Sequence, residues 1–550
     1  MRVRPATPSS CNRSPCNEQN QENSTMPINI QAFLDWGLSL LPILVVLVLM
    51  LHFRWGGARA GAVGWTAALL VAALHFGAGW QLLAYAQLKG LLLTGFVLYI
   101  IWAALVLYRV TDEAGALTTI GARLPHLTPD RGLQALLLGW VFGAFLQGVS
   151  GFGVPVAVVA PLLVGLGFPP PTAVIIASVG HSWAVTFGSL GSSFYALIGA
   201  TGRSGEELAP WSAAMLGLCC MACGLGTVWA AGGKRALRRG WPALLLIGLT
   251  MAGAQFLAVV NGLWSLGGMV AGLAGLAVGV GWARMTRARP AEGSPPRDTA
   301  SAPPTMSLGW ALFPYALLIL IVLTAQLVPP LHDVLNRIVI RVEFPPLTTA
   351  QGWTTPGGPG RTISLLGHAG ALLLYAALIT YALFHHQGRY TPGAAGRIAR
   401  AVVQKGTNSS LGIATMVGMA MSMEHAGMTH RLADGLARAA GPVFPLVSPF
   451  IGALGAFMTG SNTNSNVVFG SMQQHVATLI GASPLVILAA QTAGGAIGSL
   501  FAPAKIIVGC STVDLGGQEG PVLRASLRYG LAIIAAVALV TGAAVYGGGP

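Results

Sequence analysis

The chain has 550 residues, of which 54% are hydrophobic and only 8% are charged. So little charge cannot cover a soluble protein of this size, which excludes a soluble multidomain protein and indicates a polytopic membrane protein. The net charge of +14 does not indicate a nucleic-acid partner, because the basic residues cluster in short loops between apolar runs, as on the cytoplasmic side of membrane proteins.

The N-terminal half begins with a polar tail, residues 1–25, which has no apolar core and is expected to be disordered. Met26 opens a second candidate start of translation. The first membrane half is assigned to residues 26–283. Its apolar runs, long enough to cross a bilayer, lie near residues 36–53, 61–80, 90–110, 133–200, 209–231, 241–261 and 263–283.

A basic loop rich in Pro, Ala and Ser, residues 284–307, separates the halves and is expected to be cytoplasmic and disordered. Residues 308–550 form the second membrane half, in which 330–362 is a polar, Pro- and Gly-rich connection expected outside the cell. The chain is thus predicted to be an all-α polytopic membrane protein with about 12–14 membrane elements. The second-half runs lie near 308–329, 363–384, 408–423, 442–459, 464–503 and 526–547.

One apolar stretch, Phe145–Pro161, contains too many helix-breaking residues for an uninterrupted spanning helix: Gly148, Gly151, Gly153, Pro155 and Pro161. Non-helical backbone at membrane depth is tolerated only where it is buried in protein or lines a cavity. The stretch therefore predicts a broken helix or a re-entrant tip that faces a polar site. The substrate-binding candidates in it are Ser150, Gly151, Phe152 and Gly153.

A second unusual stretch follows Gly460, where six small polar residues occur in succession between apolar segments. Such a run is costly in hydrocarbon unless it has a role, and its neutral donors and acceptors suit a small oxygen-rich ligand or a partly dehydrated cation. An external turn is the alternative, although the flanking Phe457 and Val467–Phe469 favour burial. The substrate-binding candidates here are Gly460, Ser461, Asn462, Thr463, Asn464, Ser465 and Asn466.

Three short motifs occur twice in the same order: Gly143–Gly148 with Gly455–Gly460, Leu166–Pro170 with Ile480–Pro484, and Thr186–Leu190 with Ala496–Leu500. Repeated, interrupted apolar segments are typical of the binding site of a secondary transporter. The pattern predicts two matched hairpins, residues 143–191 and 455–503. The alternative is two Gly-rich helices that pack closely through small residues, and whether the repeats are inverted stays open.

Polar residues also match in the second arms of the repeats, where His181 aligns with Gln491 and Ser182 aligns with Thr492. Ser182 and Thr492 therefore join the substrate-binding candidates. His181 titrates near neutral pH and is the candidate for proton coupling; the alternative is a simple hydrogen bond to a neighbouring carbonyl group. Lys505 could attract an anion, but we expect it to snorkel to the cytoplasmic surface.

The apolar runs contain no pattern typical of an enzyme. The cysteines in them have no His or acidic neighbours that would complete a metal site. No nucleophile has an evident base. We therefore expect no catalytic residues, no metal and no cofactor. A passive channel is the other alternative to a transporter.

Together these motifs resemble the L-lactate permease family of bacterial secondary transporters. The resemblance implies a multi-pass protein of the bacterial inner membrane that takes up lactate, or in some members glycolate, with protons. It also implies hairpins that move as an elevator. Asn462 stands where better-known members have Asp, and His181 where they have Asn. The matching stretches are Ser150–Ala157, Leu163–Phe168, Phe187–Gly191, Pro449–Phe457, Thr459–Asn466 and Ala493–Gly498, with weaker similarity from about Leu38 to Arg524.

The resulting hypothesis is symport of one proton with L-lactate, D-lactate or glycolate. Bringing a monovalent anion into an inside-negative cell costs about 2.3 kcal/mol per 100 mV, and one co-transported cation cancels that cost. The carboxylate would lie between the two tips, against backbone N–H groups and the positive ends of helices. Sodium coupling, a different organic anion and a homo-oligomeric assembly all stay open.

Overall fold

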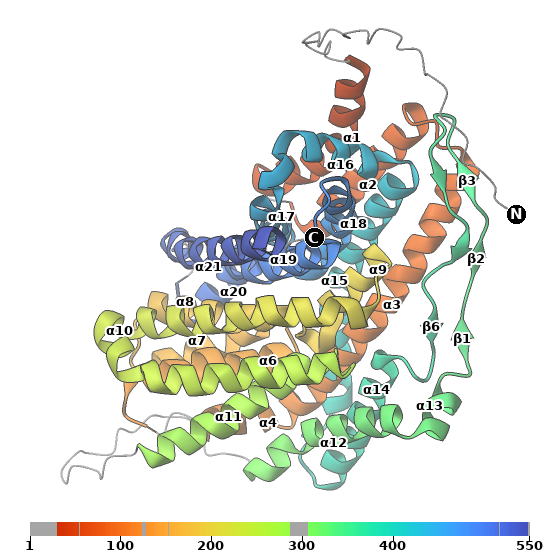
Figure 1. The fold of residues 1–550 in the computed structure, drawn as a ribbon. Coiled ribbons are helices and arrows are strands. Elements are labelled where there is room, and N and C mark those ends of the chain that lie inside the picture. The colour runs from red at the N-terminus through yellow and green to blue at the C-terminus, as the bar shows by residue number, and fades with distance from the viewer. Residues whose placement is uncertain are drawn as a thin grey trace, which may run out of the picture.

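The computed structural model describes residues 30–53, 55–123, 128–151, 153–286, 306–515 and 518–547. The tail predicted over 1–25 and most of the loop predicted over 284–307 lie outside these residues. Within the described part, the fold is a helical bundle in which twelve helical segments are long and apolar enough to cross a bilayer (Figure 1). The prediction of an all-α polytopic membrane protein is confirmed.

The first half of the chain contains one helix that turns back on itself. The helix α10 reverses direction at Gly232 and Gly233, where Gly233 has φ +57°, so its two arms run side by side (Figure 1). The helices of this half are α1 (Ile30–Leu51), α2 (Gly57–Leu74), α3 (Trp80–Glu113), α4 (Ala116–Arg123), α5 (Arg131–Gln134), the π-helix η2 (Ala135–Phe142), α6 (Gly143–Val149), α7 (Val154–Gly165), α8 (Pro170–Ser182), η3 (Trp183–Val185), η4 (Ser189–Gly191), α9 (Ser192–Thr201), α10 (Gly205–Val260) and α11 (Gly267–Met285).

The second half contains several helices that begin with proline at one of their first two positions, where the missing N–H has no helical partner to lose. Its helices are α12 (Leu308–Leu327), α13 (Pro329–Leu335), α14 (Ala369–His386), α15 (Ala394–His425), α16 (Met428–Ala440), η5 (Gly441–Val443), α17 (Phe444–Thr459), α18 (Asn462–Leu479), α19 (Pro484–Gly498), η6 (Ser499–Phe501), α20 (Pro503–Ser511) and α21 (Glu519–Gly547).

The connection predicted as a polar loop over 330–362 is more ordered than its composition indicates. It contains α13 and a long antiparallel ribbon, which lies at the opposite end of the molecule from the turn of α10 (Figure 1). Proline and glycine interrupt the ribbon every few residues, so each ladder is only two residues long. The ladders pair β1 (Val339–Ile340) with β6 (Ile363–Ser364), β2 (Glu343–Phe344) with β5 (Gly358–Pro359), and β3 (Leu347–Thr348) with β4 (Thr354–Thr355).

The membrane helices pack in two groups. In one group, α2 and α3 pack against α15, and α14 packs between α3 and α12. In the other, α6 to α11 pack with α17 to α21, and this group holds most of the largest fully buried side chains, among them Trp140, Trp183, Phe145 and Phe187. The groups meet where α15 packs against α18 and α3 packs against α9. The site described next lies at this junction.

Candidate functional site

The first glycine-rich stretch is a break between two helices. The helix α6 ends at Val149 and α7 begins at Val154, as the glycine and proline content predicts. Gly151 and Gly153 adopt φ +58° and +81°, a region that favours glycine. A Cβ atom on Gly151 would lie 1.8 Å from Ser189 Oγ, so the neighbouring chain also requires glycine there. Phe152 lies outside the described residues.

The polar run after Gly460 forms the beginning of a buried helix. The helix α17 ends at Thr459, Gly460 has φ +68°, and α18 begins at Asn462. Ser461 caps α18, because its Oγ accepts a hydrogen bond from Asn464 N at 3.3 Å. The side chains from Asn462 to Asn466 are all buried, which excludes the external turn. The positive end of the α18 dipole therefore lies at this break.

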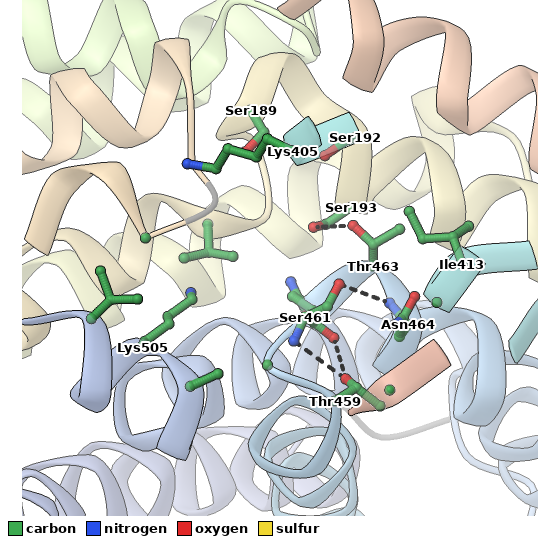
Figure 2. Close-up of a pocket in the computed structure, with 18 of the residues that line it drawn as sticks. Ser189, Ser192, Ser193, Lys405, Ile413, Thr459, Ser461, Thr463, Asn464 and Lys505 are labelled. Atoms are coloured by element: carbon green, nitrogen blue, oxygen red, sulfur yellow. Dashed lines mark hydrogen bonds between the residues drawn. The ribbon is translucent and has the colours of Figure 1, made fainter. Parts of the chain in front are cut away.

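Both breaks open onto one cavity of about 410 Å³, which also contacts α2 and α15 (Figure 2). Its polar lining consists of hydroxyl groups, amides and two lysine side chains, and no Asp or Glu occurs among its described lining residues. Of the predicted substrate-binding residues, Gly153, Gly460, Ser461, Asn462, Thr463 and Asn464 line it. The other lining residues are Gly57, Ala58, Gln147, Val185, Ser189, Ser192, Ser193, Lys405, Gly412, Ile413, Thr459, Ala504, Lys505 and Val508.

A hydrogen-bond network joins the two predicted motifs beside the cavity. Asn462 Nδ2 lies 3.1 Å from Thr186 Oγ1 and 3.2 Å from the carbonyl oxygen of Thr492. Asn466 Nδ2 donates to the carbonyl oxygen of Ser193 and to Thr492 Oγ1, both at 2.9 Å. Thr492, predicted from its position in the second repeat, is therefore a shared acceptor behind the cavity wall.

A second cross-connection lies at the cavity surface itself. The hydroxyl groups of Ser193 and Thr463 are 3.0 Å apart, and Figure 2 shows the two side chains facing each other. Four buried amide oxygens nearby have no hydrogen-bond partner in the described part of the chain. They are Oδ1 of Asn462, Asn464 and Asn466, and Oε1 of Gln147. Because buried acceptors are normally satisfied, those on the cavity-lining residues Gln147, Asn462 and Asn464 are available to a ligand hydroxyl group or a cation.

Three other predicted serines use their hydroxyl groups away from the cavity. Ser150 Oγ donates to the carbonyl oxygen of Leu146 at 2.9 Å, within its own helix. Ser182 Oγ donates to its helix backbone and lies 3.5 Å from Cys223 Sγ on α10. Ser465 Oγ donates to the carbonyl oxygen of Gly452 at 2.7 Å and so joins α18 to α17. The contacts of Ser182 and Ser465 therefore join neighbouring helices around the site, whereas that of Ser150 stays within its own helix.

His181 is fully buried on α8 and does not line the cavity. Its Nδ1 lies 2.7 Å from the carbonyl oxygen of Ala177, which can only accept, so Nδ1 carries the proton. The other ring nitrogen, Nε2, has no hydrogen-bond partner among the described residues. The simple carbonyl contact considered from the sequence is thus present, and the proton-coupling role stays a prediction.

The expectation that Lys505 snorkels to the surface is wrong. Its side chain is only 9% exposed and lines the cavity, and Nζ donates to Ser499 Oγ at 2.9 Å. The reason is a further helix break at Ala502, after which Pro503 starts α20 and turns Lys505 toward the site. Pro503 is the sequence feature from which this helix break could have been predicted. Lys405, on α15, brings a second ammonium group to the same cavity (Figure 2).

A polytopic helical bundle with a polar cavity between broken helices is the architecture expected of a membrane transporter. Among the described residues, no group of His, Cys, Asp and Glu could hold a metal ion. The sequence model of the L-lactate permease family matches residues 37–547. The chain belongs to this family.

Two relatives match over nearly their whole length. The chain is 30% identical to the L-lactate permease of Bacillus subtilis (strain 168), over 91% of this chain and 95% of the relative. It is 27% identical to the glycolate permease GlcA of Escherichia coli (strain K12), over 92% and 94%. Among solved structures, MtrF of Neisseria gonorrhoeae, described as one of a class of antimetabolite efflux pumps, aligns with a TM-score of 0.47 and 14% identity over 90% of this chain and 95% of that one.

Proposed function

We propose that this protein takes up L-lactate, or a similar 2-hydroxy monocarboxylate such as D-lactate or glycolate, by symport with a proton. The observation that carries the proposal is the cavity between the two helix breaks, which offers hydrogen-bond donors and the amines of two lysines and has no carboxylate side chain among its described lining residues. A volume of about 410 Å³ accommodates a small hydroxy acid together with water. The lactate and glycolate permeases among the relatives support the same substrate class.

The polar groups of the cavity suit both ends of such a substrate. The carboxylate would lie at the N-terminus of α18, where free backbone N–H groups and the helix dipole favour an anion. The 2-hydroxyl group would donate to the unpartnered amide oxygens of Asn462 or Asn464. The break at Gly153 would form the opposite wall of the binding site, where the absence of a Cβ atom lets a ligand approach the backbone.

The charge distribution supports a location in the bacterial inner membrane with a defined orientation. The turn of α10 carries a basic cluster, Lys234–Arg239, which the positive-inside rule assigns to the cytoplasm, and the β-ribbon is then external. The cavity reaches Gly57 at the start of α2 and Lys405 in the first half of α15, close to the basic ends of both helices. It would therefore be accessible from the cytoplasm.

The two groups of helices suggest how the site would reach the other side. The ranges 143–191 and 455–503, which we take as re-entrant or broken hairpins, both belong to the second group, whereas α2 and α15 belong to the first. Sliding of the second group against α2 and α15 would move the cavity across the membrane as an elevator. Such rigid-body motion of one bundle against another is the common basis of alternating access.

Proton symport would make uptake of the anion electroneutral and remove the cost of about 2.3 kcal/mol per 100 mV. His181 is the proton-coupling candidate from the sequence. Sodium is a second candidate for the coupled ion, favoured by the unpartnered oxygens of Asn462, Asn464 and Asn466, because such neutral oxygens can coordinate a hard cation.

Uptake of labelled L-lactate into proteoliposomes tests the proposal. We expect an inward proton gradient to drive accumulation in the absence of sodium, and unlabelled D-lactate and glycolate to compete. Accumulation that requires sodium and does not depend on the pH gradient would show that sodium, not the proton, is the coupled ion. Exchange of internal for external lactate distinguishes a carrier from a channel, since a channel shows no counterflow.

A further inference from the structure

Lys505 is a buried amine without an opposite charge beside it. Within the described residues, no Asp or Glu oxygen lies within 4 Å of its Nζ, and Nζ donates to the neutral Ser499 hydroxyl at 2.9 Å. An uncompensated ammonium ion is unfavourable at membrane depth, and such residues mark substrate or ion pathways. The position of Lys505 on the cavity wall makes an anionic ligand the natural partner.

The surroundings of Lys505 supply little other charge. The helix α20 packs against α7, α8, η6 and α21, and faces α15 across the cavity. Of the titratable groups on these elements, His181 on α8 is close enough to interact with Lys505 electrostatically. The other titratable groups are Cys510 on α20 itself and Glu519, Arg524, Arg528, Tyr529 and Tyr546 on α21. On α15 they are Lys405, which lines the cavity, and Arg397, Arg400, Glu424 and His425.

We propose that Lys505 binds the substrate carboxylate as an ammonium ion and that its proton is the one co-transported. This inference rests on the proposed uptake of a monocarboxylate with a proton. A carboxylate in the cavity stabilises the charged form of the amine, whereas without it the burial of Lys505 favours the neutral form. By linkage, the proton and the carboxylate then bind together and leave together.

The transport cycle balances in charge and protons. On the outer side, a proton and the carboxylate bind to the neutral amine, giving an ammonium–carboxylate pair with no net charge. On the inner side, the carboxylate dissociates and the ammonium group then releases its proton to cytoplasmic water. The empty site returns as a neutral amine, so neither crossing moves net charge through the membrane potential.

The two other basic groups near the site fit this role less well. His181 does not line the cavity, and its Nδ1 proton is held by the Ala177 carbonyl oxygen at 2.7 Å. Lys405 lines the cavity but interacts with the charges of Arg109 and Asp112, so a carboxylate within the protein already neighbours it. Of the two lysines in the described cavity wall, Lys505 is the buried one, and its Nζ donates to a neutral hydroxyl group.

Two substitutions of Lys505 separate carboxylate binding from proton coupling. Lys505→Arg keeps the positive charge, but a guanidinium group is not deprotonated in proteins. At equal pH, its rate of lactate exchange should stay within about threefold of the wild-type rate. Its uptake driven by a pH gradient should fall by about tenfold or more. Lys505→Met keeps the length and removes the charge, and it should raise the KM for lactate exchange by about tenfold or more.

The control is Lys234→Met, the same change at an exposed lysine on the turn of α10, which should leave both activities unaltered. Melting curves of the purified variants establish that each is folded. Wild-type KM in Lys505→Met, or full pH-driven uptake in Lys505→Arg, would overturn the role of Lys505 while leaving proton symport intact. A wild-type protein that ignores the pH gradient would instead overturn the proposed function itself.

Discussion

Asn462 Nδ2 lies 3.1 Å from Thr186 Oγ1, and this contact joins the first turn of α18 to the segment between η3 and η4. The same amide nitrogen contacts the carbonyl oxygen of Thr492 at 3.2 Å. Asn462 thus holds together elements that are almost 300 residues apart in the chain, while its Oδ1 stays without a partner among the described residues. A substitution at position 462 can therefore change both the hydrogen bonds that join these elements and the charge of the cavity.

Asn462→Asp should make lactate binding depend on pH, because it adds a titratable carboxyl group at the position where the sequence resemblance places Asp in better-known family members. A carboxylate at this position faces the same cavity as the bound anion, and we expect the KM for lactate to rise by roughly tenfold at pH 7.5. The increase should shrink at pH 5.5 as the new carboxyl group becomes protonated. Initial uptake rates at the two pH values measure this, and an equal KM for variant and wild type at pH 7.5 would contradict it.

Thr492→Val should destabilise the protein as well as slow transport. Thr492 Oγ1 accepts from Asn466 Nδ2 at 2.9 Å, and its loss leaves a buried donor with one partner fewer, at a cost of about 1–3 kcal/mol. The matched control is Thr541→Val, because among the described residues the buried Thr541 hydroxyl bonds only to the Val537 carbonyl oxygen in its own helix. Thermal unfolding followed by tryptophan fluorescence should give a lower melting temperature for the first variant than for the second.

Gly151→Ala should be far more damaging than the same change at Gly481. Both residues have positive φ, +58° and +70°, so each substitution costs about 1–2 kcal/mol of backbone strain. Only Gly151 has a neighbour in the way, since its Cβ atom would lie 1.8 Å from Ser189 Oγ. We expect Gly151→Ala to lose most of its lactate uptake and Gly481→Ala to retain it. Equal activity of the two variants would show that the first helix break does not require glycine at position 151.

His368 should make stability depend on pH at the N-terminal end of α14. Burial, with a contribution from the charge of Arg361, lowers the pKa of His368 to about 4 from its ordinary value of 6.5. Because the unfolded chain takes up the proton more readily, this stabilising contribution is full above pH 6.5 and is lost progressively toward pH 4. Its loss between pH 7 and pH 5 amounts to about 2 kcal/mol.

The substitution that isolates this effect is His368→Asn. His368 caps α14 by accepting a hydrogen bond from Gly370 N at 3.2 Å, and asparagine can cap a helix without titrating in this range. The melting temperature of the variant should therefore fall less between pH 7 and pH 5 than that of the wild type. An identical decline in both proteins would assign the pH dependence to other groups.

The helix breaks were predictable from the sequence because their cause is local. Glycine at positive φ and a run of amides and hydroxyls interrupt a membrane helix whatever surrounds them, so Gly151, Gly460 and the α18 terminus follow from composition. The β-ribbon was missed because its two-residue ladders lie among the prolines and glycines that usually mark loops. Both the helix breaks and the ribbon are set by local sequence, not by the packing of distant helices.

The composition of the cavity wall was less predictable, because it depends on which helices meet. Lys505 looks like a surface lysine when α20 is considered alone, and only the break at Ala502 directs it to the site. Ser182 looks like a ligand by its alignment with Thr492, yet its hydroxyl lies beside Cys223 on α10. Ser193 was not predicted at all, although it faces Thr463 at 3.0 Å.

The central claim, electroneutral proton–monocarboxylate symport, is tested most directly by recording lactate and proton fluxes together in proteoliposomes. Labelled lactate and an internal pH dye would be followed while potassium and valinomycin set the membrane potential. We predict one proton entering with each lactate and a rate of uptake that does not change when the potential is varied. Lactate entry without internal acidification, or a lactate flux that follows the potential, would contradict the account.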